Sequence, residues 1–225
     1  MPGLEFDLDA QLRMIEEQLT PLMAGFQPPP ENPWYRPMDA HVLYAMVRRC
    51  RPARVLELGS GYSTLVIQQA LEAGAGHEVV DPHPSALIPR EGVAVHRQSA
   101  ASAPQQLFEA LSERDILFVD TSHVLRPGGE VVRVVLEVLP TLAPGVTIHF
   151  HDFFRPFEYP RVLYEELDVH WQEHYLLQAL LAFNEQFEVL LANHALWRLR
   201  REHVKRMFPE LREGMEPSAL WFRRR

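Results

Sequence analysis

The chain has 225 residues, of which 47% are apolar and 23% charged, and it carries a formal net charge of −8. These values are typical of one sizeable globular domain, and the acidic balance argues against nucleic acid as the main partner, because phosphate binding needs a basic surface. The single cysteine, Cys50, excludes an intrachain disulfide and a cysteine-based zinc site.

The N-terminal stretch "MPGLEFDLDAQLRMIEE" is acidic and lacks the apolar core of a signal peptide. No apolar run approaches the roughly 18 residues that a membrane span needs. A lone cysteine also suits a reducing compartment. We therefore expect a cytoplasmic protein with no membrane partner.

The N-terminal part is predicted to be a helix followed by a stiff linker. Apolar residues recur at helical spacing from Leu8 to Leu19, and the proline-rich segment 27–37 cannot continue a helix. A second helix is expected over 39–49. We divide the chain into residues 1–37, the helix and linker, and residues 38–225, the main domain. The detached N-terminal helix favours a homo-oligomer.

From residue 54 onward, short apolar runs rich in β-branched residues alternate with segments of helical length. Such runs are typical of strands buried on both faces. The runs are "RVLELG", "HEVVD", "VAVH", "DILFVD" and "GVTIHFHD". Helices are expected over 64–73, 104–111 and 131–142. This alternation predicts a doubly wound, parallel α/β sheet.

Beyond Asp152 an irregular segment precedes four further elements. We expect a helix in "WQEHYLLQALLAF", a strand near "FEVLLA", a helix around "HALWRLRREHVKRMF" and a last strand in "SALWFR". In a doubly wound sheet, ligands bind outside the carboxyl ends of the strands. The residues at those ends are therefore the candidates for function.

The first strand-to-helix turn, "ELGSGYST", indicates a nucleotide site. Gly59 and Gly61 allow a ligand to approach the backbone closely, and Ser63 or Thr64 caps the following helix. Asp81 ends the next strand, where an acidic side chain can accept the hydroxyls of a ribose. A plain tight turn and a turn aspartate before Pro82 are the alternatives.

The same turn resembles the Glu-x-Gly-x-Gly motif of class I S-adenosylmethionine (SAM)-dependent methyltransferases. A dinucleotide fingerprint would place a glycine or alanine where Thr64 stands. "DILFVDTSH" and "GGEVVRVVLEVLPTLAPGVTIHFHD" are similar to the small-molecule O-methyltransferase branch with an Asp-x-x-His strand end. That branch includes macrocin-type sugar methyltransferases and cephalosporin-hydroxylase-like proteins.

The resemblance implies a seven-stranded, Rossmann-like, mostly parallel sheet with the last strand antiparallel. It also implies how SAM would bind. Glu57, Gly59 and Gly61 would lie along the methionine portion, Asp81 on the ribose, and Ser99 with Ala100 at the adenine. Ser63, a candidate cap of the helix after the turn, is a further candidate for cofactor binding.

The fifth strand ends on His151 and Asp152, and the fourth on Asp120. Metal-dependent relatives place an acid at the end of the fourth strand and a pair at the end of the fifth. The resemblance thus implies Asp120, His151 and Asp152 as ligands of Mg²⁺ or Mn²⁺, and two carboxylates suit such hard cations. The alternative is that Asp120 caps the next segment and Asp152 pairs with Arg155.

Two histidines are candidates for the catalytic base: His123 and His151. His149 lies deeper in its strand and is expected to be a core residue or to support a ligand. Trp34, Tyr35, Arg155 and Tyr159 are expected either to line the acceptor side or to anchor loops on the sheet.

We expect SAM-dependent methylation of a hydroxyl on a small molecule, of sugar or natural-product type, assisted by a divalent cation. Three alternatives are a metal-independent methyltransferase, an NAD-linked oxidoreductase and a non-catalytic SAM-binding protein.

Overall fold

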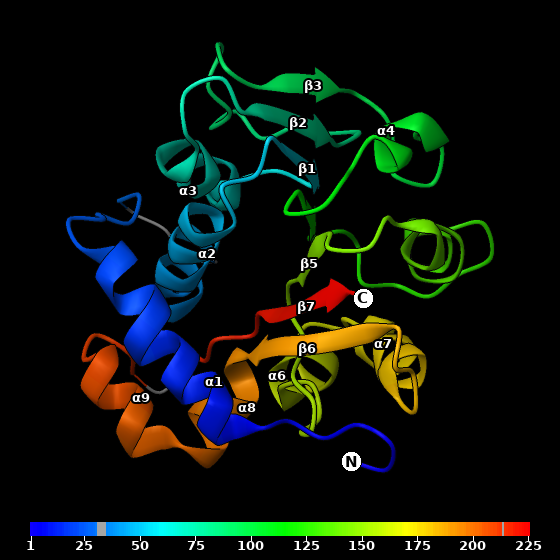
Figure 1. Cartoon of the computed structure of the whole chain (residues 1–225). Helices are drawn as coiled ribbons and strands as arrows, with labels where there is room; N and C mark the ends of the chain where they lie inside the picture. Colours follow the sequence, from blue (N-terminus) through cyan, green and yellow to red (C-terminus); the bar gives the residue numbers. More distant parts are fainter. Residues whose placement is uncertain (31–34, 213) are drawn as a thin grey trace.

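In the computed structural model, which describes residues 1–30, 35–212 and 214–225, seven strands form one sheet in the order β3-β2-β1-β4-β5-β7-β6 (Figure 1). The strands are β1 (Arg54–Leu58), β2 (Gly76–Val80), β3 (Ala94–His96), β4 (Ile116–Val119), β5 (Thr147–Phe150), β6 (Phe187–Ala192) and β7 (Leu220–Arg224). The first five pair in parallel, and β7 runs antiparallel to both β5 and β6. The predicted fold class is confirmed.

Helices cover both faces of this sheet. They are α1 (Leu8–Arg13), α2 (Pro37–Cys50), α3 (Tyr62–Ala70), α4 (Gln105–Glu109), α5 (Glu130–Arg133), α6 (Arg161–Glu165), α7 (Glu173–Leu181), α8 (Asn193–Leu199) and α9 (Arg201–Met207). Wider π turns, η1 (Met14–Leu19) and η3 (Val134–Val138), continue α1 and α5, and short 3₁₀ turns, η2 (Thr20–Met23) and η4 (Leu139–Thr141), follow them.

Strand alternation divides the core into two hydrophobic clusters. Ile116 and Phe118 of β4 pack on the side of α2, α3 and α8, whereas Leu117 and Val119 pack on the side of α4, α5 and α7. All four side chains are fully buried, as expected for a central parallel strand. The resulting three layers leave the carboxyl ends of β1, β2, β4 and β5 at one edge, where the loops carry the candidate residues.

Two helical predictions can be compared with the structure, one that differs from it and one that agrees with it. The helix expected around 194–208 divides into α8 and α9, because Arg200 has φ −133° and ψ 33°, outside the helical region. The valine-rich run after Glu130 is helical as predicted, although β-branched residues favour strands. Its valines at positions 131, 134, 135 and 138 are buried on the sheet, so packing outweighs their intrinsic preference.

The N-terminal helix packs on the main domain rather than standing apart from it. Leu12, Ile15 and Leu19 are buried in the same cluster as α2 and one face of the sheet. The division at residue 37 and the homo-oligomer remain predictions.

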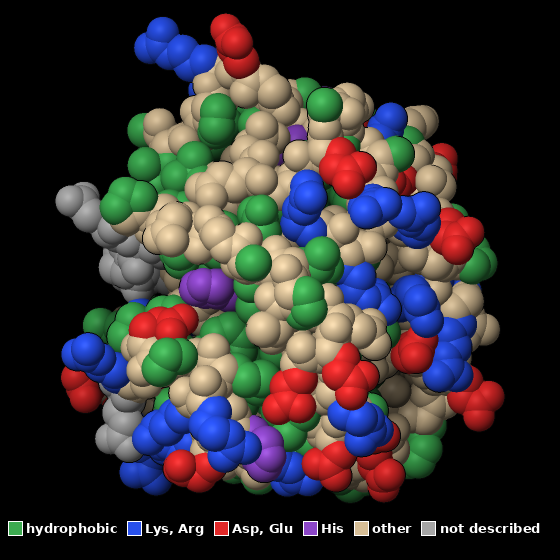
Figure 2. All heavy atoms as spheres, turned by 60° about the vertical axis from the view of Figure 1, so that its left-hand side comes forward, with side chains coloured by type: hydrophobic (Ala, Val, Ile, Leu, Met, Phe, Trp, Pro, Cys, Tyr) green, Lys and Arg blue, Asp and Glu red, His purple; other side chains and the backbone are tan. Residues whose placement is uncertain are grey.

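The surface carries its charges in a mixed pattern. On the face in Figure 2, acidic and basic side chains lie interspersed over the right and lower parts, with one of each projecting at the top. Among the helices of the described ranges, none combines the length and apolar character that a bilayer span requires.

Candidate active site

The glycine turn after β1 is shaped by its contact with the end of β4. Gly59 has φ +94°, and a Cβ atom at this position would lie 2.0 Å from the backbone oxygen of Asp120. Gly61 has extended backbone, and a Cβ there would meet no described atom within 4 Å. Gly59 therefore serves the fold, whereas Gly61 leaves open space beside the turn.

This difference yields a prediction about stability. Gly59→Ala should lower the free energy of unfolding by about 3 kcal/mol, because it adds a left-handed alanine and a clash with backbone. Gly61→Ala is the matched control and should unfold at nearly the wild-type denaturant midpoint. Urea titration followed by circular dichroism measures both variants, and equal midpoints for the two would contradict this account of the turn.

Glu57 lies beneath the turn and is fully buried. Its Oε1 accepts a hydrogen bond of 2.6 Å from the Ser63 hydroxyl, and its Oε2 lies 2.9 Å from Nε2 of His77. Glu57 does not line either cavity described below. The structure thus shows it joining β1, β2 and α3, while its predicted contact with SAM remains a prediction.

Of the remaining predicted cofactor residues, Gly61 and Ser63 line the larger cavity described below, and the other four line a cavity of about 300 Å³. Its lining includes Gly59, Ser60, Asp81, Ser99, Ala100 and Asp120. Asp81 accepts hydrogen bonds from the Ser60 hydroxyl (2.5 Å) and from the backbone N–H of His83 (2.8 Å). Asp81 therefore both shapes its turn and presents a carboxylate to this cavity.

A second cavity of about 890 Å³ opens on the other side of the turn. Tyr35 and Tyr159 line it, as expected, together with Phe154, Phe157 and Trp171. Arg155 is engaged elsewhere, by Gln178 and Glu158. Trp34 lies outside the described residues. The two cavities share Ser60 and Asp120 as lining residues, so they adjoin at this point.

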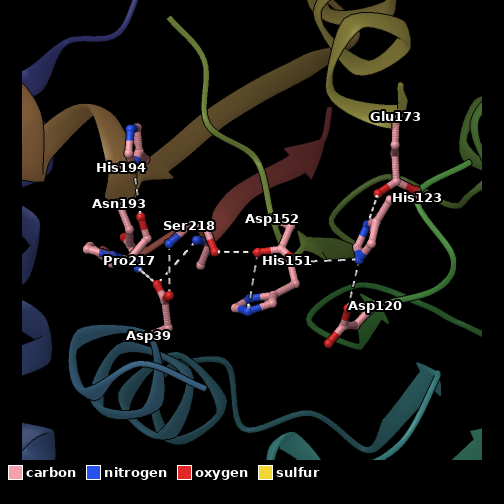
Figure 3. A network of polar contacts seen from close by, with 11 residues as sticks. Asp39, Asp120, His123, His151, Asp152, Glu173, Asn193, His194, Pro217 and Ser218 are labelled. Carbon is pink, nitrogen blue, oxygen red and sulfur yellow. Dashed lines mark hydrogen bonds and ion pairs between the residues drawn. The ribbon is translucent and has the colours of Figure 1, made fainter. Parts of the chain in front are cut away.

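Two acids and a histidine converge at the shared point (Figure 3). Nε2 of His123 lies 3.3 Å from Oδ1 of Asp120 and 3.6 Å from Oδ2 of Asp152. One ligand atom from each of these residues lies within 4.8 Å of the others, which is a spacing that one cation can bridge. Two carboxylates and one imidazole suit Mg²⁺ or Mn²⁺. We call these three residues the acid–histidine cluster.

The cluster differs from the predicted ligand set in its histidine. The structure brings His123 between the two acids, whereas Nε2 of His151 lies 3.9 Å from Oδ1 of Asp152. The ring of His151 stacks on Tyr35, with 4.8 Å between centroids. Left-handed backbone at His123 (φ 58°) and Asp152 (φ 55°) turns both side chains toward Asp120. Such conformations are costly and often mark functional sites.

Glu173, at the start of α7, completes the environment of His123. Its Oε2 lies 2.8 Å from Nδ1 of His123, and its side chain is buried. A carboxylate that accepts from one imidazole nitrogen directs the other nitrogen at a metal. Sequence reasoning missed Glu173, which lies 50 positions beyond its partner. Its only signal is an acidic residue at the first turn of an apolar helix.

The acids and histidines of the site shift one another's pKa values. Burial acts to raise the pKa of Asp120, but the hydrogen bond with His123 and the nearby histidines outweigh it and lower this pKa to about 2. Burial acts to lower the pKa of His123, but Asp120, Glu173 and Asp152 raise it well above its usual value. Burial raises the pKa of Glu173. Without a cation, the neighbouring acids therefore favour the imidazolium form of His123.

His149 is a core residue, one of the two predicted alternatives. Register places it between Phe118 of β4 and Trp221 of β7. Its ring stacks on Phe118 at 4.1 Å and lies 4.5 Å from the ring of Trp221. Neither ring nitrogen has a hydrogen-bond partner among the described residues, and burial holds the pKa of His149 well below its usual value.

Residues 56–153 match a family described as a methyltransferase domain. Among curated proteins, no sequence matches the chain. The chain also resembles solved structures over nearly its whole length. A Thermobifida fusca protein described as a methyltransferase is 19% identical, with a TM-score of 0.52, over 97% of this chain and 92% of that one. An O-methyltransferase from Bacillus cereus in complex with S-adenosylhomocysteine (SAH) is 15% identical, with a TM-score of 0.50. This match covers 96% of this chain and 91% of that one. These likenesses show an α/β, Rossmann-like methyltransferase fold.

Proposed function

We propose that the chain is a SAM-dependent O-methyltransferase that acts on a small-molecule hydroxyl with the help of a divalent cation. One observation carries this proposal: the cavity lined by Asp81 and the larger cavity meet at Ser60 and Asp120, beside the acid–histidine cluster. A methyl donor in the first cavity and an acceptor in the second would be in contact there. The match of residues 56–153 to a methyltransferase domain supports the same reading.

The smaller cavity is the proposed cofactor site. SAM, when bound, supplies a methyl group already activated by its sulfonium. Asp81 can accept ribose hydroxyls in place of the Ser60 hydroxyl that it now binds. Ser99 and Ala100, where the adenine is expected, also line this cavity. The complex of the Bacillus cereus relative with SAH supports this choice of cofactor.

The acid–histidine cluster is the proposed cation site. Asp120, His123 and Asp152 would hold the ion, and Glu173 would keep Nδ1 of His123 protonated so that Nε2 faces the site. A bound divalent cation lowers the pKa of an acceptor hydroxyl. Because one nitrogen cannot hold a cation and accept a proton together, we assign proton acceptance to His151. This histidine lines the acceptor cavity beside Asp152.

The acceptor is proposed to be a small molecule of sugar or natural-product type, consistent with the branch that the sequence resembles. The larger cavity, at about 890 Å³, has room for such a molecule beside the shared point. Alignment of the acceptor oxygen with the methyl group would supply much of the rate acceleration.

Calorimetric titration of SAH into the protein tests the cofactor. We expect Asp81→Ala to weaken SAH binding about 30-fold, because a carboxylate that accepts from hydroxyls contributes about 2 kcal/mol. Glu91→Ala, which removes an exposed acid from the β2–β3 connection, is the matched control and should bind SAH as the wild type does. If the wild type ignores SAH but is stabilised thermally by NADH, an oxidoreductase replaces this proposal.

A further inference from the structure

Asp152 is held by Ser218, a residue to which the proposed chemistry assigns no role. Its Oδ1 accepts a hydrogen bond of 2.9 Å from the hydroxyl of Ser218, and its Oδ2 faces His123 at 3.6 Å (Figure 3). Continuing the β5–β7 register, in which Phe150 pairs with Leu220, places Ser218 directly opposite Asp152. The serine therefore binds one carboxylate oxygen and leaves the other for the cluster.

Ser218 is itself fixed by a buried carboxylate from α2. Asp39 is fully buried, and its Oδ2 accepts from the backbone N–H of Ser218 at 2.9 Å. Its Oδ1 accepts from the backbone N–H of Ala219 at 3.2 Å and from the amide of Asn193 at 2.7 Å. Asp39 lies in the first turn of α2, where the helix dipole favours a negative charge.

The neighbouring backbone groups are paired as well. The carbonyl oxygen of Ser218 accepts from the N–H of Phe153, and that of Ala219 accepts from the N–H of Asn193, at 2.8 and 2.9 Å. The carbonyl of Pro217 accepts from Nδ1 of His194 at 3.1 Å. Segment 217–219 is thus tied to β5, α2 and α8. Such a frame holds the Ser218 hydroxyl in one position, which a free loop would not do.

Asp152 needs this support because its own backbone is unfavourable. Its φ of 55° lies in the left-handed region, which is uncommon for residues other than glycine and persists only where surrounding contacts maintain it. In the structure, its carboxylate meets Ser218 on one side and the two histidines on the other. Without the serine, the carboxylate loses this hydrogen bond and keeps its contacts with the two imidazoles, between which it could rotate.

We infer that Ser218, held by Asp39, is a positioning residue that fixes the carboxylate of Asp152 in the orientation the acid–histidine cluster needs. This inference rests on the proposed function, because its expected consequence is a change in cation affinity. It also links the cluster to the acceptor cavity, because Ser218 and Glu216 of the same segment line that cavity. A residue that supports a ligand in this way changes cation affinity about 10- to 100-fold when it is removed.

The test is Ser218→Ala in the full chain, with Mn²⁺ and SAH titrated separately by calorimetry and a crystal structure of the metal-free variant. We expect Mn²⁺ binding at least about tenfold weaker than in the wild type, SAH binding unchanged, and the Asp152 carboxylate rotated or in several conformers. Thr147→Val is the matched control. It removes another buried hydroxyl of the β5–β7 region, one whose contact is with Cys50, and should leave Mn²⁺ affinity unchanged.

Wild-type Mn²⁺ affinity in Ser218→Ala, together with an unmoved Asp152, would overturn the inference. Failure of the wild type to bind Mn²⁺ would instead remove the cation from the proposed function. In that case the orientation of Asp152 in the variant crystal still decides the role of Ser218. Failure of the wild type to bind SAH would refute the cofactor assignment. It would not affect the other two measurements, the Mn²⁺ affinity and the orientation of Asp152 in the crystal.

Discussion

Asp120→Asn is expected to lower kcat about 1000-fold, which corresponds to about 4 kcal/mol of transition-state stabilisation. Asp120 lines both cavities and lies 3.3 Å from Nε2 of His123. Because its pKa is lowered to about 2, the carboxylate is charged at every pH at which the protein would work. Asparagine keeps nearly the same shape but removes the charge and replaces one carboxylate oxygen by an NH2 group.

The measurement is single-turnover methyl transfer to an acceptor found by screening phenols and sugars, together with calorimetric titration of Mn²⁺ and SAH. Loss of Mn²⁺ binding with little change in SAH affinity is the expected pattern. Asp115→Asn, the same substitution at the opposite end of β4, is the matched control. Asp115 accepts from the backbone of Arg54 and Ser112, so its loss should reduce thermal stability but not the kcat of the folded protein. An unchanged kcat in Asp120→Asn would refute the cation-assisted mechanism.

Mn²⁺ binding is expected to release about one proton, because His123 must lose its proton before Nε2 can hold a cation. The pKa of His123 is raised well above its usual value, since Asp120 and Glu173 outweigh the effect of burial. Below that raised pKa, Mn²⁺ affinity should therefore increase about tenfold per pH unit, and above it the increase should end.

The stability of the metal-free protein should change with pH in the opposite direction. The imidazolium of His123 stabilises the folded state fully below the unfolded pKa near 6.5. That contribution is lost as the pH rises through the raised pKa of the folded state. Urea unfolding at several pH values measures this loss.

Calorimetry of Mn²⁺ binding in buffers with different ionisation enthalpies measures the released proton. His123→Asn should abolish both the release and the pH dependence of affinity. His149→Phe is the matched control, because His149 is buried and its pKa is held well below its usual value, so it carries no proton to release. Proton release that survives in His123→Asn would show that another residue supplies the nitrogen that binds the cation, and His151 would be the first candidate.

Much of the fold was predictable from local patterns. The strands around Val55, Leu117 and Ile148 are short runs of apolar residues, which is how strands buried on both faces appear in sequence. The antiparallel placement of β7 came from the family resemblance, because no local pattern distinguishes it. The break at Arg200 and the π turns were not predictable, since they depend on how each helix packs against the sheet.

The candidate site was predictable only in part. Asp81, Asp120 and Asp152 follow from one rule, that ligands collect at the carboxyl ends of parallel strands. It was not predictable that His123, rather than His151, lies between the two acids. Alternation assigns a face to each strand residue, but the left-handed turns at His123 and Asp152 come after the strands have ended.

The sequence by itself determined the class of sheet, the glycine turn and the acids at the strand ends, because each depends on residues adjacent in the chain. Only the tertiary structure decided which atoms meet. Glu173 reaches His123 across 50 positions, and Ser218 reaches Asp152 across 66. These contacts exist because α7 and the segment just before β7 are packed against the strand ends by the burial of apolar faces elsewhere in the fold. A polar contact formed in this way leaves no periodic or local signal, so it becomes visible only when the chain has folded.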